Sequence, residues 1–188
     1  EVLDNPKRPL VAIIGGAKIS DKIDLLDRFI DIADVVAVGG AMSNTFLLAE
    51  GVGVGSSLAE PDDVPHARRI LKKARAKAKN NNFVFYVPQD GVVAEKMESN
   101  TKTRIVDWGT HIIADIESYP KRPDATASKV AKDEEILDIG PFSGAFMAGS
   151  IQLANTVIWN GAMGVTEIKS LQTATGPFSH GTELVVEA

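Results

Sequence analysis

Short apolar runs alternate with longer amphipathic stretches along the chain. The runs cover residues 10–14, 35–38, 83–87, 136–139 and 156–159, and each is rich in β-branched or aromatic side chains at consecutive positions. Strands that are buried on both faces of a parallel sheet have this pattern. The pattern therefore predicts five buried strands.

The stretches between the runs have helical spacing. Apolar residues recur at intervals of four, three and four at Ile19, Ile23, Leu26 and Ile30. This spacing predicts an amphipathic helix with Ser20 as its N-cap. A basic helix is expected from Pro65 to Lys79 and a helix of small residues from Gly144 to Ala154. Strands that alternate with helices form βαβ units, so the expected fold is a three-layer α/β/α doubly wound parallel sheet of the Rossmann-like class.

The polar segment 95–132 interrupts this rhythm. It contains the sequence YPKRP at residues 119–123, and we expect loops with a minor hairpin there. The chain has 188 residues, with no internal repeat and no clear boundary of a second domain, so one domain is expected.

Glycines follow four of the five runs, and proline follows the fifth. The strand-end sequences are GGAK (15–18), GGAM (39–42), VPQD (87–90), DIGP (138–141) and WNGAMG (159–164). In an open parallel sheet these turns share the carboxyl edge, where ligands bind, and glycine lets the backbone approach a ligand closely. One such turn is explained by tight βα geometry alone. Four together favour a nucleotide or another phosphorylated ligand at the helix N-termini.

Composition and motifs exclude several classes of protein. There is no cysteine, so disulfides and thiolate metal sites are excluded, and the formal net charge of -5 argues against nucleic acid or an anionic membrane as the main partner. No apolar run approaches the about 18 residues of a membrane helix and no signal peptide is evident, so a cytoplasmic location is expected. The P-loop, G-x-G-x-x-G and G-x-S-x-G motifs are absent. The basic face of residues 65–79 is interpreted as a solvated helix face in preference to a phosphate or nucleic-acid patch.

Several longer motifs resemble one enzyme family. They are GGAKISDKI (15–23), GGAMSNTF (39–46) with GSSL (55–58), VPQDGVVA (87–94), LDIGP (137–141), and TVIWNGAMGVTE (156–167) with PFSHGT (177–182). Their order and spacing are similar to those of the nucleotide-binding half of phosphoglycerate kinase, from Pro9 to the C-terminus. The resemblance implies that residues 1–188 are the C-terminal domain with about five of the family's six strands. It also implies that the N-terminal phosphoglycerate domain and a glycine-rich loop with the principal metal ligand lie outside this chain.

The resemblance also implies roles for individual residues. Lys18 would bind the α-phosphate side of the nucleotide and Lys22 the transferring phosphoryl group, with both on one side of a helix start. Glu167 would accept hydrogen bonds from the ribose, and Met42 and Leu137 would form apolar walls for the adenine. The other expected nucleotide contacts are Gly16, Ala17, Gly39, Gly40, Ala41, Ile136, Asn160, Gly161, Ala162, Gly164 and Val165. Each role has a structural alternative. Lys18 and Lys22 could be ordinary exposed lysines, and Met42 and Leu137 could be plain core residues.

The implied activity is reversible phosphoryl transfer between 1,3-bisphosphoglycerate and ADP, giving 3-phosphoglycerate and ATP in glycolysis. Mg²⁺ would enter with the nucleotide, and no residue of this chain is assigned as a metal ligand. A monomer is expected, without nucleic-acid or membrane partners, and the isolated chain is expected to be inactive. A non-catalytic nucleotide-binding module and a remnant that binds nothing are the alternatives. The chain departs from the family pattern near the nucleoside pocket, at Ala41, Ser56, Ile136, Ala162 and Thr166.

Overall fold

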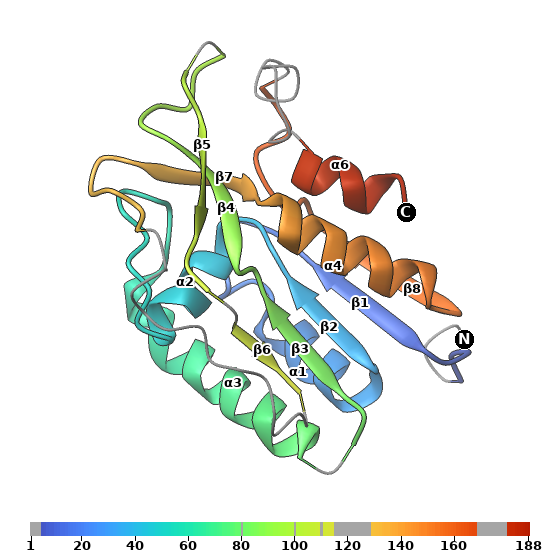
Figure 1. The fold of residues 1–188 in the computed structure, drawn as a ribbon. Coiled ribbons are helices and arrows are strands. Elements are labelled where there is room, and N and C mark those ends of the chain that lie inside the picture. The colour runs from blue at the N-terminus through green and yellow to red at the C-terminus, as the bar shows by residue number, and fades with distance from the viewer. Residues whose placement is uncertain (1–4, 80, 100, 110, 115–128, 169–179) are drawn as a thin grey trace.

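A five-stranded sheet forms the centre of the fold (Figure 1). The computed structural model describes residues 5–79, 81–99, 101–109, 111–114, 129–168 and 180–188, so the YPKRP sequence lies outside the described residues. The strand order is β6-β3-β2-β1-β8. Its members are β1 (Leu10–Ile14), β2 (Val35–Val38), β3 (Val84–Val87), β6 (His111–Ile113) and β8 (Thr156–Asn160). β1, β2, β3 and β8 are parallel, and β6 pairs antiparallel with β3 at one edge.

A second, three-stranded sheet corrects one strand of the sequence prediction. Its order is β5-β4-β7, with β4 (Asp90–Ala94) between β5 (Arg104–Asp107) and β7 (Glu135–Ile139), and both pairings are antiparallel. The run at 136–139 was expected in the parallel sheet, and it is a strand of this smaller sheet instead. Of the β4–β5 pair only β5 lies within the polar segment 95–132, so this pair differs from the minor hairpin expected inside that segment. The α/β class is confirmed, with a mixed sheet in place of a wholly parallel one.

Helices cover both faces of the five-stranded sheet (Figure 1). One face carries α1 (Ile23–Ile32), α2 (Met42–Ala49) and α3 (Val64–Ala78), the last entered through the 3-10 turn η1 (Pro61–Asp63). The other face carries α4 (Pro141–Gln152) and α6 (His180–Val186), which pack against each other. The completely buried strand β1 alternates between two cores: Leu10, Ala12 and Ile14 face one, and Val11 and Ile13 face the other.

The start of α1 differs from the prediction. The helix begins at Ile23, its N-cap position is Lys22, and no side chain caps it. Ser20, the predicted N-cap, instead donates its hydroxyl to the Glu60 carboxylate at 2.8 Å. Lys18 and Lys22 therefore precede the helix, and the argument that placed them on one helical face was wrong.

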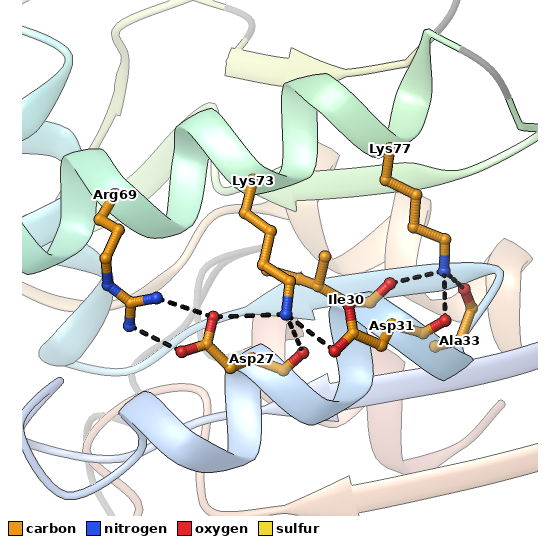
Figure 2. A network of polar contacts seen from close by, with 7 residues as sticks. All are labelled: Asp27, Ile30, Asp31, Ala33, Arg69, Lys73 and Lys77. Atoms are coloured by element: carbon orange, nitrogen blue, oxygen red, sulfur yellow. Dashed lines mark hydrogen bonds and ion pairs between the residues drawn. The ribbon is translucent and has the colours of Figure 1, made fainter.

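The basic face of α3 is largely a seam against α1 (Figure 2). The Arg69 guanidinium donates to both carboxylate oxygens of Asp27, at 3.1 and 2.7 Å. Lys73 donates to the Asp31 carboxylate at 2.9 Å and to the Asp27 carbonyl at 2.8 Å. The Arg69 guanidinium lowers the pKa of Asp27. The predicted basic face is therefore solvated only in part: Arg69 is exposed although it joins two helices, and Lys73 is half-buried between them.

Lys77 closes the same seam at the end of α1 (Figure 2). Its ammonium group donates to the carbonyls of Ile30, Asp31 and Ala33, at 2.5, 3.1 and 2.8 Å. It also lies 4.5 Å from the centroid of the Phe83 ring. The last carbonyls of a helix have no partner within the helix, and a cation there complements its dipole. Lys77 thus caps α1 from a neighbouring helix.

Candidate functional site

Three strand-end loops meet at the carboxyl edge of the large sheet. They follow β1, β2 and β8, as the glycine pattern predicted. The Gly15 N–H donates to the Asn160 carbonyl at 2.8 Å, and the Gly40 N–H donates to the Met163 carbonyl at 2.8 Å. The Met42 N–H donates to the Gly16 carbonyl at 3.0 Å. These bonds fix the three loops against one another and make them a single surface.

Glycine is required where the loops cross. Gly40 has φ of +66°, and a β-carbon there would lie 2.6 Å from the Gly16 carbonyl oxygen. Gly161 has φ of +90°, and a β-carbon there would collide with the Gly15 carbonyl. Both the backbone conformation and the space exclude a side chain at these positions. The glycines therefore serve the close approach of loop to loop in this structure.

A cavity of about 590 Å³ opens beside the crossing loops. Such a volume lies in the ordinary range for small-molecule sites. Ten predicted nucleotide contacts line it: Gly16, Ala17, Gly40, Ala41, Ile136, Leu137, Ala162, Gly164, Val165 and Glu167. The structure thus gathers residues from four separate sequence motifs around one cavity.

Six of the sixteen predicted contacts are absent from the lining, and two of these, Met42 and Gly39, are buried. Met42 is completely buried in the core beneath the large sheet, so it is the plain core residue of the structural alternative. Gly39 is also absent from the lining, and a β-carbon there would strike the Met163 side chain, which is itself buried. Leu137 does line the cavity, although it is 4% exposed.

The structure adds lining residues that the motifs did not predict. Leu58, Met97 and Trp108 supply large apolar side chains, and the Trp108 indole N–H donates to the Pro88 carbonyl at 2.7 Å. Met97 and Trp108 lie in the polar segment that was expected to form loops, where no periodicity marks them. Leu58 was quoted only within the GSSL motif. Met97 lies between β4 and β5 and Trp108 directly follows β5, whereas Leu58 lies in the segment before η1.

The lining is acidic, and its described residues include no lysine or arginine. Asp90, Glu135, Asp138 and Glu167 line the cavity. These carboxylates would repel a polyphosphate, which would therefore lie outside the cavity. They would not repel an uncharged nucleoside. The lining of the cavity therefore suits an uncharged group better than a phosphate.

The two lysines lie next to this lining. Lys18 directly follows the lining residue Ala17, and its side chain is exposed. The Lys22 ammonium donates to the Asn160 side-chain oxygen at 2.6 Å, which joins the loop after β1 to the end of β8. Lys22, Asn160 and Gly161 thus stand together outside the lining. A β-carbon at the lining residue Gly16 would lie 3.4 Å from the Lys22 side chain, so both lysines adjoin residues of the lining.

Asp138 connects the cavity to α6. Its carboxylate accepts hydrogen bonds from the Thr182 hydroxyl at 2.6 Å, from the Thr182 N–H at 3.2 Å and from the Ile139 N–H at 2.8 Å. A β-carbon at Gly164 would collide with this carboxylate. Burial raises the pKa of Asp138 to about 6 against the opposing effect of these bonds. The half-buried carboxyl group therefore supports both the Gly164 loop and the C-terminal helix.

Asp90 organises the start of α4. Its fully buried carboxylate accepts bonds from the Phe142 and Ser143 N–H groups, at 3.0 and 2.9 Å, and from the Ser143 hydroxyl at 2.6 Å. The Tyr86 hydroxyl lies 3.2 Å from the same serine oxygen, and burial raises the pKa of Tyr86. Asp90 thus occupies the anion-binding N-terminus of α4, so that helix end is not available to a ligand.

Comparison with known proteins identifies the family. The family model described as phosphoglycerate kinase matches residues 1–188, the whole chain. The chain belongs to the phosphoglycerate kinase family. The phosphoglycerate kinase of Desulforapulum autotrophicum is 39% identical over 186 residues, which are 99% of this chain and 40% of that protein. The phosphoglycerate kinase of Chloroflexus aurantiacus is 37% identical over 186 residues, 99% of this chain and 39% of that protein.

Solved phosphoglycerate kinases have the same fold. The structure of phosphoglycerate kinase from Coxiella burnetii superposes with a TM-score of 0.77 at 32% identity, over 99% of this chain and 40% of that one. The enzyme from Pyrococcus horikoshii OT3 gives a TM-score of 0.70 at 22% identity, over 99% of this chain and 40% of that chain, which shows the likeness of fold alone. The chain therefore spans about 40% of the length of the phosphoglycerate kinases it matches.

Proposed function

We propose that residues 1–188 form the C-terminal, nucleotide-binding domain of a phosphoglycerate kinase. The nucleoside of ADP or ATP lies in the cavity, and its phosphates extend toward Lys18 and Lys22. One observation carries this proposal: the described residues of the lining include four carboxylates and no lysine or arginine, while the Lys22 side chain lies beside the lining residue Gly16. A nucleotide, with an uncharged base and an anionic tail, has the matching distribution of charge.

Individual contacts follow from the same orientation. Gly40, Ala41, Leu137 and Val165 border the base, and Glu167 accepts hydrogen bonds from the ribose hydroxyls. A carboxylate suits this role because it has acceptor positions only. Glu167 is exposed, and its carboxylate accepts a bond from the Thr166 N–H at 3.0 Å, so acceptor positions remain for a ribose.

In the proposed reaction a β-phosphate oxygen of ADP attacks the acyl-phosphate phosphorus of 1,3-bisphosphoglycerate. The bond from that phosphorus to the carboxyl oxygen breaks, and 3-phosphoglycerate leaves as a carboxylate. Negative charge spreads over the transferred oxygens in the transition state, and a fixed cation stabilises it. We assign this role to Lys22. Its bond to Asn160 holds the ammonium group in place before the phosphates arrive.

Magnesium has no assigned ligand here. Among the described residues, no group of three or more histidine, aspartate or glutamate side chains could hold a metal ion. We propose that Mg²⁺ arrives with the nucleotide phosphates and that its principal protein ligand lies outside this chain. Bound magnesium would neutralise part of the charge of those phosphates.

The partners and setting follow from the family. ATP or ADP binds this chain, while 3-phosphoglycerate or 1,3-bisphosphoglycerate would be held by a separate N-terminal domain of the complete enzyme. We propose a monomeric enzyme of cytoplasmic glycolysis. None of the helices in the described part of the chain has both the length and the apolar character to cross a bilayer. A non-catalytic nucleotide-binding module is the second candidate, because the cavity and lysines would serve it equally.

Calorimetric titration with ADP tests the proposal. Val165→Trp would fill the cavity that Val165 lines and should abolish binding, whereas Val157→Trp adds the same side chain on the exposed strand β8 and should leave binding unchanged. Equal affinity in the two variants would show that ADP does not use this cavity.

A further inference from the structure

The loop that carries both lysines has its own support. The loop runs from the end of β1 to the start of α1 and has no capping side chain at the helix. Ser20 lies midway between Lys18 and Lys22, and both of its donors bind one carboxylate: the Ser20 N–H and hydroxyl donate to Glu60 at 3.2 and 2.8 Å. Hydrogen bonds to an ionised acceptor are stronger than those between neutral groups. Glu60 therefore holds the loop from a segment 40 residues further along the chain.

Glu60 is itself fixed by a buried helix. Its N–H donates to the Thr45 hydroxyl oxygen at 3.0 Å, and Thr45 lies on α2 with no exposed surface. Two residues earlier, the Leu58 carbonyl accepts a bond from the Asn44 side-chain amide at 2.9 Å, and Leu58 lines the cavity. The segment that ends at Glu60 thus joins the core and the cavity wall to the lysine loop.

The other end of the segment is tied to the small sheet. The Ser57 hydroxyl oxygen accepts a bond from the Ile136 N–H at 2.8 Å. The opposite side of the lysine loop is held by the bond from Met42 N–H to the Gly16 carbonyl. The loop is therefore held at Gly16 by a backbone bond, at Ser20 by the Glu60 side chain and at Lys22 by the Asn160 side chain.

We infer that Glu60 is a positioning residue for the phosphate site: through Ser20 it holds Lys18 and Lys22 where they meet the phosphates of a bound nucleoside diphosphate. This inference rests on the proposed nucleotide function and adds a residue to it. Glu60 does not line the cavity, so it acts on the ligand only through the loop. Its removal should weaken binding of the phosphates and leave the nucleoside contacts intact.

A structural role of Glu60 predicts a different result. Glu60 also precedes η1 and α3, where an acidic side chain stabilises a helix start. Loss of that effect would reduce folding stability and would weaken adenosine and ADP binding alike. Comparing the two ligands therefore separates positioning from stability.

The experiment titrates adenosine and ADP separately into the ¹⁵N-labelled 188-residue chain, followed by NMR. We expect Glu60→Ala to weaken ADP binding about five- to tenfold, as for the loss of charge-assisted hydrogen bonds, while adenosine affinity changes less than about twofold. Glu60→Gln keeps an acceptor oxygen and should recover part of the loss. Asp62→Ala removes an exposed carboxylate from the neighbouring turn and should change neither affinity.

A double variant tests the route through Ser20. Ser20→Ala should weaken ADP binding less than Glu60→Ala, because the backbone donor remains, and the double variant should be no weaker than Glu60→Ala alone. Equal losses for both ligands, or unchanged ADP affinity in Glu60→Ala and Glu60→Gln, would overturn the role of Glu60 and leave the proposed function standing. A wild-type chain that binds neither ligand would overturn both.

Discussion

Replacing Asp138 by asparagine should change how stability depends on pH. Burial raises the pKa of Asp138 to about 6 from the ordinary 3.8. Well below pH 3.8 the carboxyl group is protonated in both the folded and the unfolded chain. As the pH rises toward 6 the unfolded chain releases the proton first, so the free energy of unfolding falls. Above pH 6 both states are ionised and the loss is complete.

The magnitude follows from the two pKa values. Their difference, about 6 minus 3.8, multiplied by about 1.36 kcal/mol per pKa unit, gives about 3 kcal/mol. This value is an upper figure, because the half-buried carboxyl group still borders the cavity. Asparagine does not ionise, and it keeps one oxygen for the Thr182 hydroxyl. Because the unfolded chain is already partly ionised at pH 4, Asp138→Asn should gain up to about 2 kcal/mol relative to the wild type between pH 4 and pH 8.

Urea unfolding of both proteins at each pH measures this difference. Effects of the substitution that do not depend on pH cancel when values at pH 4 and pH 8 are compared. Asp133→Asn, at an exposed position, is the control and should give a difference that stays constant with pH. A constant difference for Asp138→Asn as well would refute the assignment of a buried, high-pKa carboxyl group at the Gly164 loop.

Three further results are expected. Lys77→Met should lower the free energy of unfolding by about 1–3 kcal/mol, because the carbonyls of Ile30, Asp31 and Ala33 lose their donor. Lys72→Met, at an exposed position of α3, should change it little, and equal urea midpoints for the two variants would contradict the cap. In a complete enzyme containing this chain, Lys22→Ala should lower kcat far more than ADP affinity, and equal losses would make Lys22 a ground-state phosphate ligand. The isolated chain should show no turnover in a coupled assay, because it lacks the domain that would orient 1,3-bisphosphoglycerate against ADP. Orientation of two reactants supplies on the order of 7–11 kcal/mol, and half of that is about three to four powers of ten in rate. Turnover within tenfold of an intact enzyme would contradict this.

The sequence predicted the large sheet better than the small one. Consecutive apolar positions identify β1, β2 and β3, because strands inside a parallel sheet are covered on both faces. The same pattern identifies β8, but the prediction that this strand is buried was wrong, because β8 lies at the edge of the sheet and Val157 and Trp159 are exposed. The run at 136–139 has the same length and composition, and nothing in such a short run specifies its neighbour. Its partner is β4, which joins it through antiparallel bonds set by the tertiary structure.

The same limits apply to the site. The crossing loops could be predicted because glycine marks each strand end. The start of α1 could not be predicted, because the helical spacing of apolar residues extends back to Ile19. That residue is buried although it precedes the helix. Ser20 has the residue type of an N-cap, but a carboxylate distant in sequence binds it. Trp108 lies in a segment without periodicity, so only the folded hairpin brings it to the cavity.

A crystal structure of this chain with ADP tests the central proposal most directly. The nucleoside should lie in the cavity between Ala41, Leu137 and Val165, and the diphosphate should lie outside it, within hydrogen-bonding distance of the Lys22 ammonium group. ADP bound on another face, or bound with its phosphates among Asp90 and Asp138, would contradict the proposal.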